Sequence, residues 1–255
     1  MRRLAIRPGA IGDFVVSLPA LECLRADYLE IWTASANVPL VRFASRVRSF
    51  ASTGLDLLGI ADPPPRLVDE LRSFDSIVSW YGSNRSEFRD LVRELSLPFT
   101  FFPALPVEGA PQHAVDFYLD QVRTIASCRS DGIPRIECPP QARGRFAVIH
   151  PFSGSPRKNW PLEKFRALAA KLEPIMPVHW CAGPDDPPLA EAVRMENLYD
   201  LACWLSKAAI FIGNDAGITH LAAAVGTPVL AMFGPTDPAV WAPRGPHVRI
   251  VRWKP

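Results

Sequence analysis

Three loops carry most of the side chains that could do chemistry. The first, residues 7–13 (Arg-Pro-Gly-Ala-Ile-Gly-Asp), ends in a carboxylate at a predicted helix start. Asp13 is either an N-cap, a position that favours aspartate, or a general base facing a cleft, with Arg7 as an anion contact beside it. Gly9 and Gly12 would let a substrate approach the backbone closely.

The second loop, residues 150–161, reads His-Pro-Phe-Ser-Gly-Ser-Pro-Arg-Lys-Asn-Trp-Pro and follows a predicted buried strand. Its hydroxyls, Ser153 among them, and its adjacent cations Arg157 and Lys158 suit a diphosphate group. An ordinary solvated loop is the alternative for the two cations. His150, at a strand end, is interpreted as a structural histidine.

The third loop, residues 213–217 (Gly-Asn-Asp-Ala-Gly), separates a short apolar run from an alanine-rich helical pattern. This predicts a turn at a helix N-terminus, where unpaired N–H groups and the positive end of the helix dipole favour anions. The backbone N–H groups of Ala216 and Gly217 are therefore candidates for holding phosphate oxygens.

Two side chains of this turn need separate interpretations. Asp215 would repel a diphosphate, so it is better as a helix cap or as an acceptor for a sugar hydroxyl. His220 lies about one turn further on, over the same surface. Its position above the anion-binding turn favours a contact with a ligand, with core packing as the alternative.

An alternation of strands and helices must position these loops. This pattern predicts α/β architecture with parallel sheets, in which ligands lie at the carboxyl ends of the strands. The predicted strands are 4–6, 29–33, 47–51, 76–80, 99–102, 146–150, 178–181, 208–212, 228–233 and 248–251. The predicted helices are 14–26, 39–44, 65–74, 86–95, 113–127, 162–172, 187–196, 198–207 and 218–225.

A polar stretch rich in proline and glycine, residues 129–144, interrupts the alternation and is predicted to be a linker. We expect an N-terminal domain over residues 1–138 and a C-terminal domain over residues 145–255. Two such βαβ halves would face one another across a cleft.

Composition excludes several classes of protein. The net charge is +2 over 255 residues with no block of Lys or Arg, which argues against a nucleic-acid partner. The five cysteines have no zinc or redox spacing, so we expect reduced thiols in a cytosolic protein. No apolar run is long enough to span a membrane, and the N-terminus is a poor signal peptide.

Missing motifs narrow the chemistry further. The chain has no Gly-x-Gly, no P-loop and no Asp-x-Asp metal clasp, and its histidines lack metal-ligand spacing. The sequence therefore predicts neither a dinucleotide cofactor nor a bound metal.

Taken together, the loops resemble glycosyltransferase family 9, the ADP-heptose–lipopolysaccharide heptosyltransferases. The resemblance rests on residues 7–21, on His-Pro…Arg-Lys-Asn-Trp-Pro within 150–161, and on Gly-Asn-Asp-Ala-Gly-Ile-Thr-His-Leu-Ala-Ala-Ala with Phe-Gly-Pro-Thr-Asp-Pro within 213–238. The clear match covers the first 25 residues and most of 145–245; the remainder matches in layout only.

The resemblance implies a GT-B fold with two Rossmann-like domains, the acceptor on the first and the nucleotide sugar on the second. It implies an inverting, metal-independent transfer of a heptose or related sugar from an ADP-sugar, which is a substrate rather than a cofactor. The acceptor would be a saccharide or lipid-linked glycan of the lipopolysaccharide-core type, met in the cytoplasm with at most peripheral contact with the inner membrane. The implied residues are Asp13 as base, Arg7 and Gly12 on the acceptor side, and Ser153, Lys158, Asp215, Ala216, Gly217 and His220 on the donor side.

Departures from the family pattern keep alternatives open. Ala216 stands where the family usually has Thr, and the first domain is short for the family. A GT-B protein that binds nucleotide or glycan without turnover is therefore the alternative. A GT-B nucleotide-sugar epimerase is a weaker one, because the sequence offers no convincing set of acid and base carboxylates.

Overall fold

The computed structural model describes residues 1–60, 63–107, 109 and 111–254. Its contacts divide the chain into two units. Unit 1 holds residues 1–10, 17–110 and 114–131, and unit 2 holds residues 11–16, 111–113 and 132–255. The predicted domain boundaries differ from these units mainly because residues 11–16, at the start of the first long helix, group with the C-terminal half.

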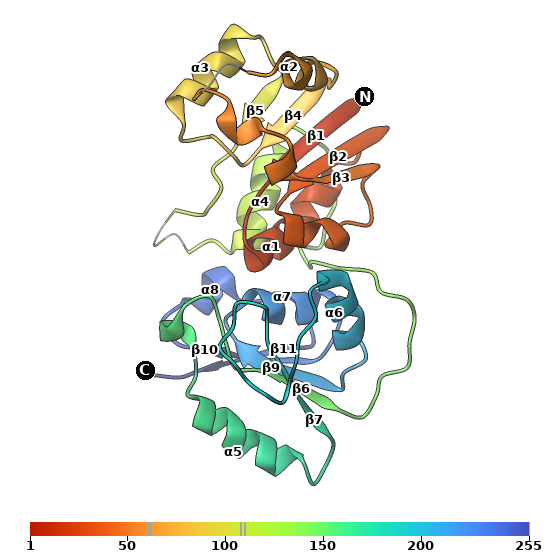
Figure 1. The fold of residues 1–255 in the computed structure, drawn as a ribbon, viewed down its shortest axis with the longest axis vertical. Helices are drawn as coiled ribbons and strands as arrows, with labels where there is room; N and C mark the ends of the chain where they lie inside the picture. The colour runs from red at the N-terminus through yellow and green to blue at the C-terminus, as the bar shows by residue number, and fades with distance from the viewer. Residues whose placement is uncertain (61–62, 108, 110, 255) are drawn as a thin grey trace. The chain divides into compact units, whose positions relative to one another are not determined.

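Unit 1 is a parallel five-stranded sheet with strand order β3-β2-β1-β4-β5 (Figure 1). Its strands are β1 (Arg2–Arg7), β2 (Tyr28–Thr33), β3 (Arg46–Ser49), β4 (Ser76–Ser79) and β5 (Phe99–Phe101). Its α-helices are α1 (Ile11–Cys23), whose first turn belongs to unit 2, α2 (Pro65–Arg72), α3 (Ser86–Glu94) and α4 (Ala114–Arg123). Strands β1, β2 and β4 pack with α2 and α3 in a core in which Leu4, Trp32, Ile77 and Phe88 are almost inaccessible to solvent.

The predicted helix at 39–44 is wrong. The chain instead forms a 3₁₀ turn over Ser35–Leu40, after which residues 41–45 have no regular structure. Pro39 removes a backbone donor, and the buried Asn37 side chain donates to Gly9 O at 3.0 Å. That side-chain bond fixes a turn that hydrophobic periodicity does not register.

The prediction that all five cysteines are reduced is also wrong. Cys23, the last residue of α1, forms a disulfide with Cys128, with the two Cα atoms 4.9 Å apart. Cys138, Cys181 and Cys203 are free thiols. The fold brings together two cysteines 105 positions apart, which sequence spacing could not reveal.

Unit 2 is a parallel six-stranded sheet with strand order β11-β10-β9-β6-β7-β8. Its strands are β6 (Ala147–His150), β7 (Val178–Cys181), β8 (Ala192–Val193), β9 (Ile210–Asn214), β10 (Val229–Phe233) and β11 (Val248–Arg252). Its helices are α5 (Leu162–Leu172), α6 (Leu198–Leu205), α7 (Gly217–Ala224) and α8 (Pro238–Trp241).

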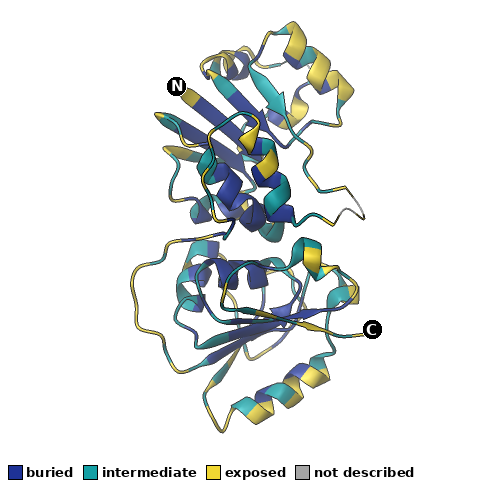
Figure 2. Ribbon diagram, turned by 180° about the vertical axis from the view of Figure 1, so that it is seen from behind, coloured by how far each residue is buried: buried dark blue, intermediate teal, exposed yellow. Residues whose placement is uncertain are grey.

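The two sides of unit 2 differ in burial. Figure 2 shows α7 almost wholly buried, whereas α5 carries an exposed outer face. Helix α7 ends before Gly226, whose φ of +80° suits glycine and confirms the predicted stop. The central strands β6 and β9 are the most deeply buried, so the loops that follow them start from rigid positions.

The predicted helix at 187–196 is wrong as well. Pro187 and Pro188 cannot supply helix hydrogen bonds. The Arg194 side chain instead donates to three loop carbonyls, including Pro187 O at 2.8 Å. The segment is therefore a loop held by side-chain hydrogen bonds, and it leads into the two-residue strand β8.

Within the part of the chain that the structure describes, no helix has both the length and the apolar character needed to cross a bilayer.

Candidate functional site

The turn between β9 and α7 presents an uncapped helix N-terminus. The N-cap position is Ala216, in extended conformation, and no side chain of the described residues caps it. Asp215 is therefore not the helix cap that the sequence allowed. It precedes the cap position, and its carboxylate points to another partner. The first N–H groups of α7 keep the anion-binding character expected of a helix start.

That partner is Lys158. The Lys158 ammonium lies 2.8 Å from an Asp215 carboxylate oxygen, with the Asp215 side chain buried and the Lys158 side chain one-third exposed. The predicted cation and the predicted carboxylate thus meet at the start of α7. The pair neutralises a carboxylate that would otherwise repel an anion bound at this turn.

Asn214 joins the second and third loops and was missed by the sequence analysis. It is fully buried at the end of β9, donating to Pro151 O at 2.7 Å and accepting from Trp160 N at 2.9 Å. Its complete burial, which requires polar partners, is seen only in the structure, so the sequence carried no signal for this role. Asn214 holds the Lys158 loop against the α7 turn.

Ser153 organises its own loop. Its hydroxyl lies 2.8 Å from Ser155 O and 2.7 Å from Asn159 Oδ1. The two partners flank the short 3₁₀ turn Pro156–Lys158, which ends in the cation. Ser153 thus helps to place Lys158, whether or not it also contacts a ligand.

The first turns of α1 and α7 pack backbone to backbone within unit 2. A methyl group on Gly217 would lie 2.8 Å from Ile11 Cβ and 3.0 Å from Gly12 N. Gly12 in turn faces Gly217 and the His220 ring at ordinary contact distance. The close approach of the two helix starts thus gives both glycines a packing role, beyond the substrate access that the sequence suggested for Gly12.

His220 is held neutral. Burial lowers the pKa of His220 to about 4, with the neighbouring His113 and Lys158 charges acting in the same direction and Asp215 opposing them. Its Nδ1 has no hydrogen-bond partner among the described residues. A buried, neutral imidazole beside an anion turn can exchange a hydrogen bond with a ligand but does not supply a cation at neutral pH.

Asp13 is the third residue of α1, and the N-cap of that helix is Ala10. The N-cap alternative for Asp13 is therefore wrong. Asp13 is half-buried and belongs to unit 2 with Gly217, His220 and the Lys158–Asp215 pair.

Arg7 lies in unit 1, apart from this group in the contact division. Arg7 is only 2% exposed. Its guanidinium donates to the Tyr118 hydroxyl at 2.7 Å, and its Cζ lies 4.8 Å from the centroid of the Tyr118 ring. Tyr118 in turn donates to Ala104 O. Within unit 1, Arg7 joins the end of β1 to α4.

A second pair of titratable groups lies at the neighbouring strand ends. His150 Nε2 is 3.1 Å from an Asp186 carboxylate oxygen, and Gly183 N donates to the same oxygen at 2.6 Å. Burial acts to raise the pKa of Asp186, but these hydrogen bonds together with the charges of His150 and Arg194 lower that pKa on balance. The structural interpretation of His150 is supported by this pair, although His150 Nδ1 has no partner among the described residues.

Asp186 also lines a cavity of about 590 Å³ beyond the end of β7. The other lining residues are Pro184, Pro188, Leu189, Ala190, Ala192 and Arg194. This volume falls within the range of about 300–1,000 Å³ that small-molecule sites occupy. Across the described ranges, no three side chains of the metal-ligating types lie close enough together to hold a metal ion.

Comparisons with known proteins identify the family of this chain. The model of glycosyltransferase family 9 (heptosyltransferase) matches residues 100–254, well over half of the chain. A lipopolysaccharide heptosyltransferase 3 of Escherichia coli is 30% identical over 114 residues, which is 38% of this chain and 34% of that protein. A lipooligosaccharide heptosyltransferase 2 of Haemophilus influenzae is 27% identical over 38% of this chain and 33% of its own. The aligned stretch thus spans about one third of each relative.

Solved structures extend the likeness to nearly the whole fold. A glycosyl transferase family 9 structure from Veillonella parvula has a TM-score of 0.77 at 16% identity, covering 99% of this chain and 86% of that one. The E. coli heptosyltransferase WaaC with ADP has a TM-score of 0.73 at 19% identity, covering 99% and 93%. These likenesses confirm the predicted GT-B fold.

Proposed function

This chain belongs to glycosyltransferase family 9 (heptosyltransferase), and from that premise we propose that it transfers a heptose or a related sugar from an ADP-sugar to a saccharide acceptor. The observation that carries the proposal is the Lys158–Asp215 pair at the uncapped start of α7. It sets a cation beside free helix N–H groups, an arrangement suited to a diphosphate.

The donor's two halves fit two features of unit 2. The diphosphate would lie at the α7 turn after β9, and the nucleoside would extend toward the cavity beyond β7. Strand β6 alone separates β9 from β7, so the two features lie about 10 Å apart at strand spacings of about 4.8 Å. That span suits a nucleoside diphosphate. The related E. coli WaaC, whose structure was solved with ADP, supports the choice of nucleotide.

The proposed transfer is inverting. An acceptor hydroxyl attacks the anomeric carbon, its proton passes to the Asp13 carboxylate, and the sugar–phosphate bond breaks with the electron pair leaving on ADP. The leaving diphosphate gains negative charge in the transition state. Lys158 and the N–H groups of Gly217 and its neighbours would stabilise that charge, which makes metal-independent transfer part of the proposal.

The remaining parts of the proposal concern the acceptor. The related E. coli and H. influenzae proteins are named for lipopolysaccharide and lipooligosaccharide, so we take a core-type glycan as the acceptor class. The reaction would take place in the cytoplasm, with at most peripheral contact with the inner membrane. Arg7 and Gly12 stay assigned to the acceptor side.

An activity assay with a matched control tests this proposal. ADP release from ADP-heptose would be measured across a panel of core saccharides for wild type, Asp13→Asn and Asp200→Asn. Asp200 is an exposed acid at the third position of α6, as Asp13 is in α1, so it controls for the helix dipole. We expect kcat to fall about 10²–10⁴-fold for Asp13→Asn and to hold for Asp200→Asn. Equal turnover in all three proteins would refute the role of Asp13 as the base.

Ala216 favours a second candidate, a protein that binds the nucleotide without turnover. No hydroxyl stands at the N-cap of α7, so the donor loses one potential hydrogen bond there. Calorimetry showing ADP-sugar binding, combined with no transfer to any acceptor and no gain from Ala216→Thr, would select this alternative.

A further inference from the structure

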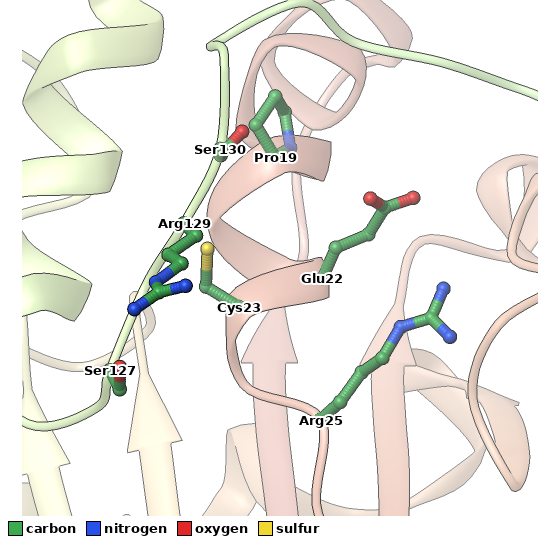
Figure 3. Close-up of a pocket in the computed structure, with 7 residues that line it drawn as sticks. All are labelled: Pro19, Glu22, Cys23, Arg25, Ser127, Arg129 and Ser130. Carbon is green, nitrogen blue, oxygen red and sulfur yellow. The ribbon is translucent and has the colours of Figure 1, made fainter.

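The Cys23–Cys128 disulfide lies in the wall of a cavity that the proposed transfer does not use. The cavity has a volume of about 390 Å³ and is lined by Pro19, Glu22, Cys23, Arg25, Ser127, Arg129 and Ser130. All of these residues belong to unit 1. Figure 3 shows Arg25 and Cys23 extending from the end of α1, and Arg129 from the segment after α4. The volume is at the small end of the range for ligand pockets.

The lining carries a net positive charge. Arg25 and Arg129 are both exposed, and Glu22 supplies the opposing carboxylate. The Arg25 guanidinium also lies over the Phe43 ring, 5.3 Å from its centroid, which limits the positions it can adopt. Two serines add hydroxyl donors. A small, polar anion is the ligand that such a lining fits best.

The two sulfur atoms are not equivalent. Cys23 lines the cavity and Cys128 is absent from its lining, so a molecule in the cavity meets Cys23 first. Cys23 also ends α1, where the negative end of the helix dipole disfavours a thiolate. Cys128 lies beyond the end of α4, in a segment without regular structure, so no helix end acts on it in this way. Cys128 is therefore the better leaving group.

We propose that this cavity is a thiol–disulfide exchange site for a small anionic thiol, which attacks Cys23 and releases Cys128. In the first step the thiolate sulfur bonds to Cys23 Sγ, the Cys23–Cys128 bond breaks, and Cys128 takes the electron pair as a thiolate. In the second step another thiolate attacks the mixed disulfide and releases Cys23. The protein gains two electrons, and two small thiols leave as their disulfide.

The exchange changes how the segment after α4 is anchored. Cys128 immediately precedes residues 129–146, which contain no helix or strand. Further along, this segment is tied to unit 2 through Ile136 N to Ala224 O at 2.9 Å and Tyr199 OH to Glu137 O at 3.1 Å. The disulfide is a covalent tie at the other end, joining Cys128 to α1. Reduction breaks the bond between Cys128 and α1 and leaves the two hydrogen bonds to unit 2 in place.

Reduction kinetics of the full chain test the site. The oxidised protein would be treated with glutathione, 2-mercaptoethanol or cysteamine, which are anionic, neutral and cationic thiols. The rate constant for each thiol would be divided by the rate constant for the reaction of the same thiol with a small uncharged disulfide, which corrects for the intrinsic reactivity of the thiol. We expect glutathione to exceed 2-mercaptoethanol by about fivefold after this correction, the effect of about one unit charge at ~4 Å in water, and 2-mercaptoethanol to exceed cysteamine by a similar factor. High salt should remove the preference.

Two further measurements locate the chemistry. Arg25→Gln with Arg129→Gln should abolish the preference, whereas Arg93→Gln, an exposed arginine paired with Asp90 on α3, should keep it. Alkylation followed by mass spectrometry should find the glutathione adduct on Cys23 and the alkyl group on Cys128. An adduct mainly on Cys128, or a rate indifferent to thiol charge and salt, would overturn the proposal. If the double arginine variant fails to fold, the salt dependence of the wild-type rates tests the proposal, and a preference for glutathione that persists at high salt would contradict it.

Discussion

The contact between the first turns of α1 and α7 gives a sharp prediction, because its two glycines differ in the space around them. In Gly217→Ala the new β-carbon would lie 2.8 Å from Ile11 Cβ and 3.0 Å from the Gly12 backbone nitrogen. In Gly12→Ala the nearest atoms would be Gly217 Cα and His220 Cδ2, both at 3.5 Å. The first substitution requires a helix to move, and the second meets ordinary van der Waals contact.

The magnitudes follow from this difference. Overpacking a tight contact costs about 1–3 kcal/mol, while replacing glycine by alanine in a helix recovers about 0.5–1 kcal/mol. Gly217→Ala should therefore lower the free energy of unfolding by about 1–2 kcal/mol. Gly12→Ala should leave it unchanged or raise it by up to about 1 kcal/mol. At about 2–4 °C per kcal/mol, Gly217→Ala should lower the unfolding midpoint by about 2–8 °C.

Differential scanning calorimetry of the wild type and both variants measures these shifts, and ADP titration measures the function of the turn. Displacing α7 moves its first N–H groups, so Gly217→Ala should also weaken ADP binding, whereas Gly12→Ala should bind ADP nearly as the wild type does. The reasoning fails if the two variants melt at the same temperature, or if Gly12→Ala is the more destabilised of the two.

Three further predictions concern charge and covalent structure. Because burial lowers the pKa of His220 to about 4, its contribution to stability is fully present above pH ~6.5 and falls by about 3 kcal/mol as the pH drops to 4. Urea unfolding at pH 7.5 and 5 should show about 2 kcal/mol of this loss in the wild type and a smaller loss in His220→Gln. Lys158→Met should raise the Kd for ADP by calorimetry about 10–100-fold, whereas Arg157→Met, the exposed neighbouring cation, should change it little. Reducing the Cys23–Cys128 bond, which closes a loop of 105 positions, should lower the unfolding free energy by about 4 kcal/mol, and a Cys23→Ser/Cys128→Ser double variant should not respond to reductant.

The sequence was most informative where burial alone decides the structure. The strand at 178–181 and the helix at 162–172 have the predicted bounds, because a largely apolar or strongly amphipathic run leaves few other solutions. The same holds for the turn at 213–217, where glycines and a following alanine-rich run marked the start of α7.

Prediction failed where a side chain replaces a backbone partner. Asn37 and Arg194 bond to carbonyls in segments that were predicted to be helical or to border a helix, and no periodicity reports such bonds. Asp215 was interpreted as a cap of α7 or as an acceptor for a sugar hydroxyl, but it does not cap the helix and pairs with the Lys158 ammonium, 57 positions away. The disulfide and the Asn214 bridge likewise depend on contacts between distant segments, which a single sequence does not display.

The membership of residues 11–16 in unit 2 has a consequence for how the chain is made. The first turn of α1 completes its packing only when Gly217 is available, 206 positions later in the chain (217 − 11). At about 5–20 residues per second, synthesis separates these two segments by about 10–40 s. During that interval the strands of unit 1 can pair, while the turn that carries Asp13 lacks its contact with Gly217. A nascent chain interrupted before α7 would therefore contain a folded sheet and an unsupported helix start, which is the form that a chaperone or protease would encounter.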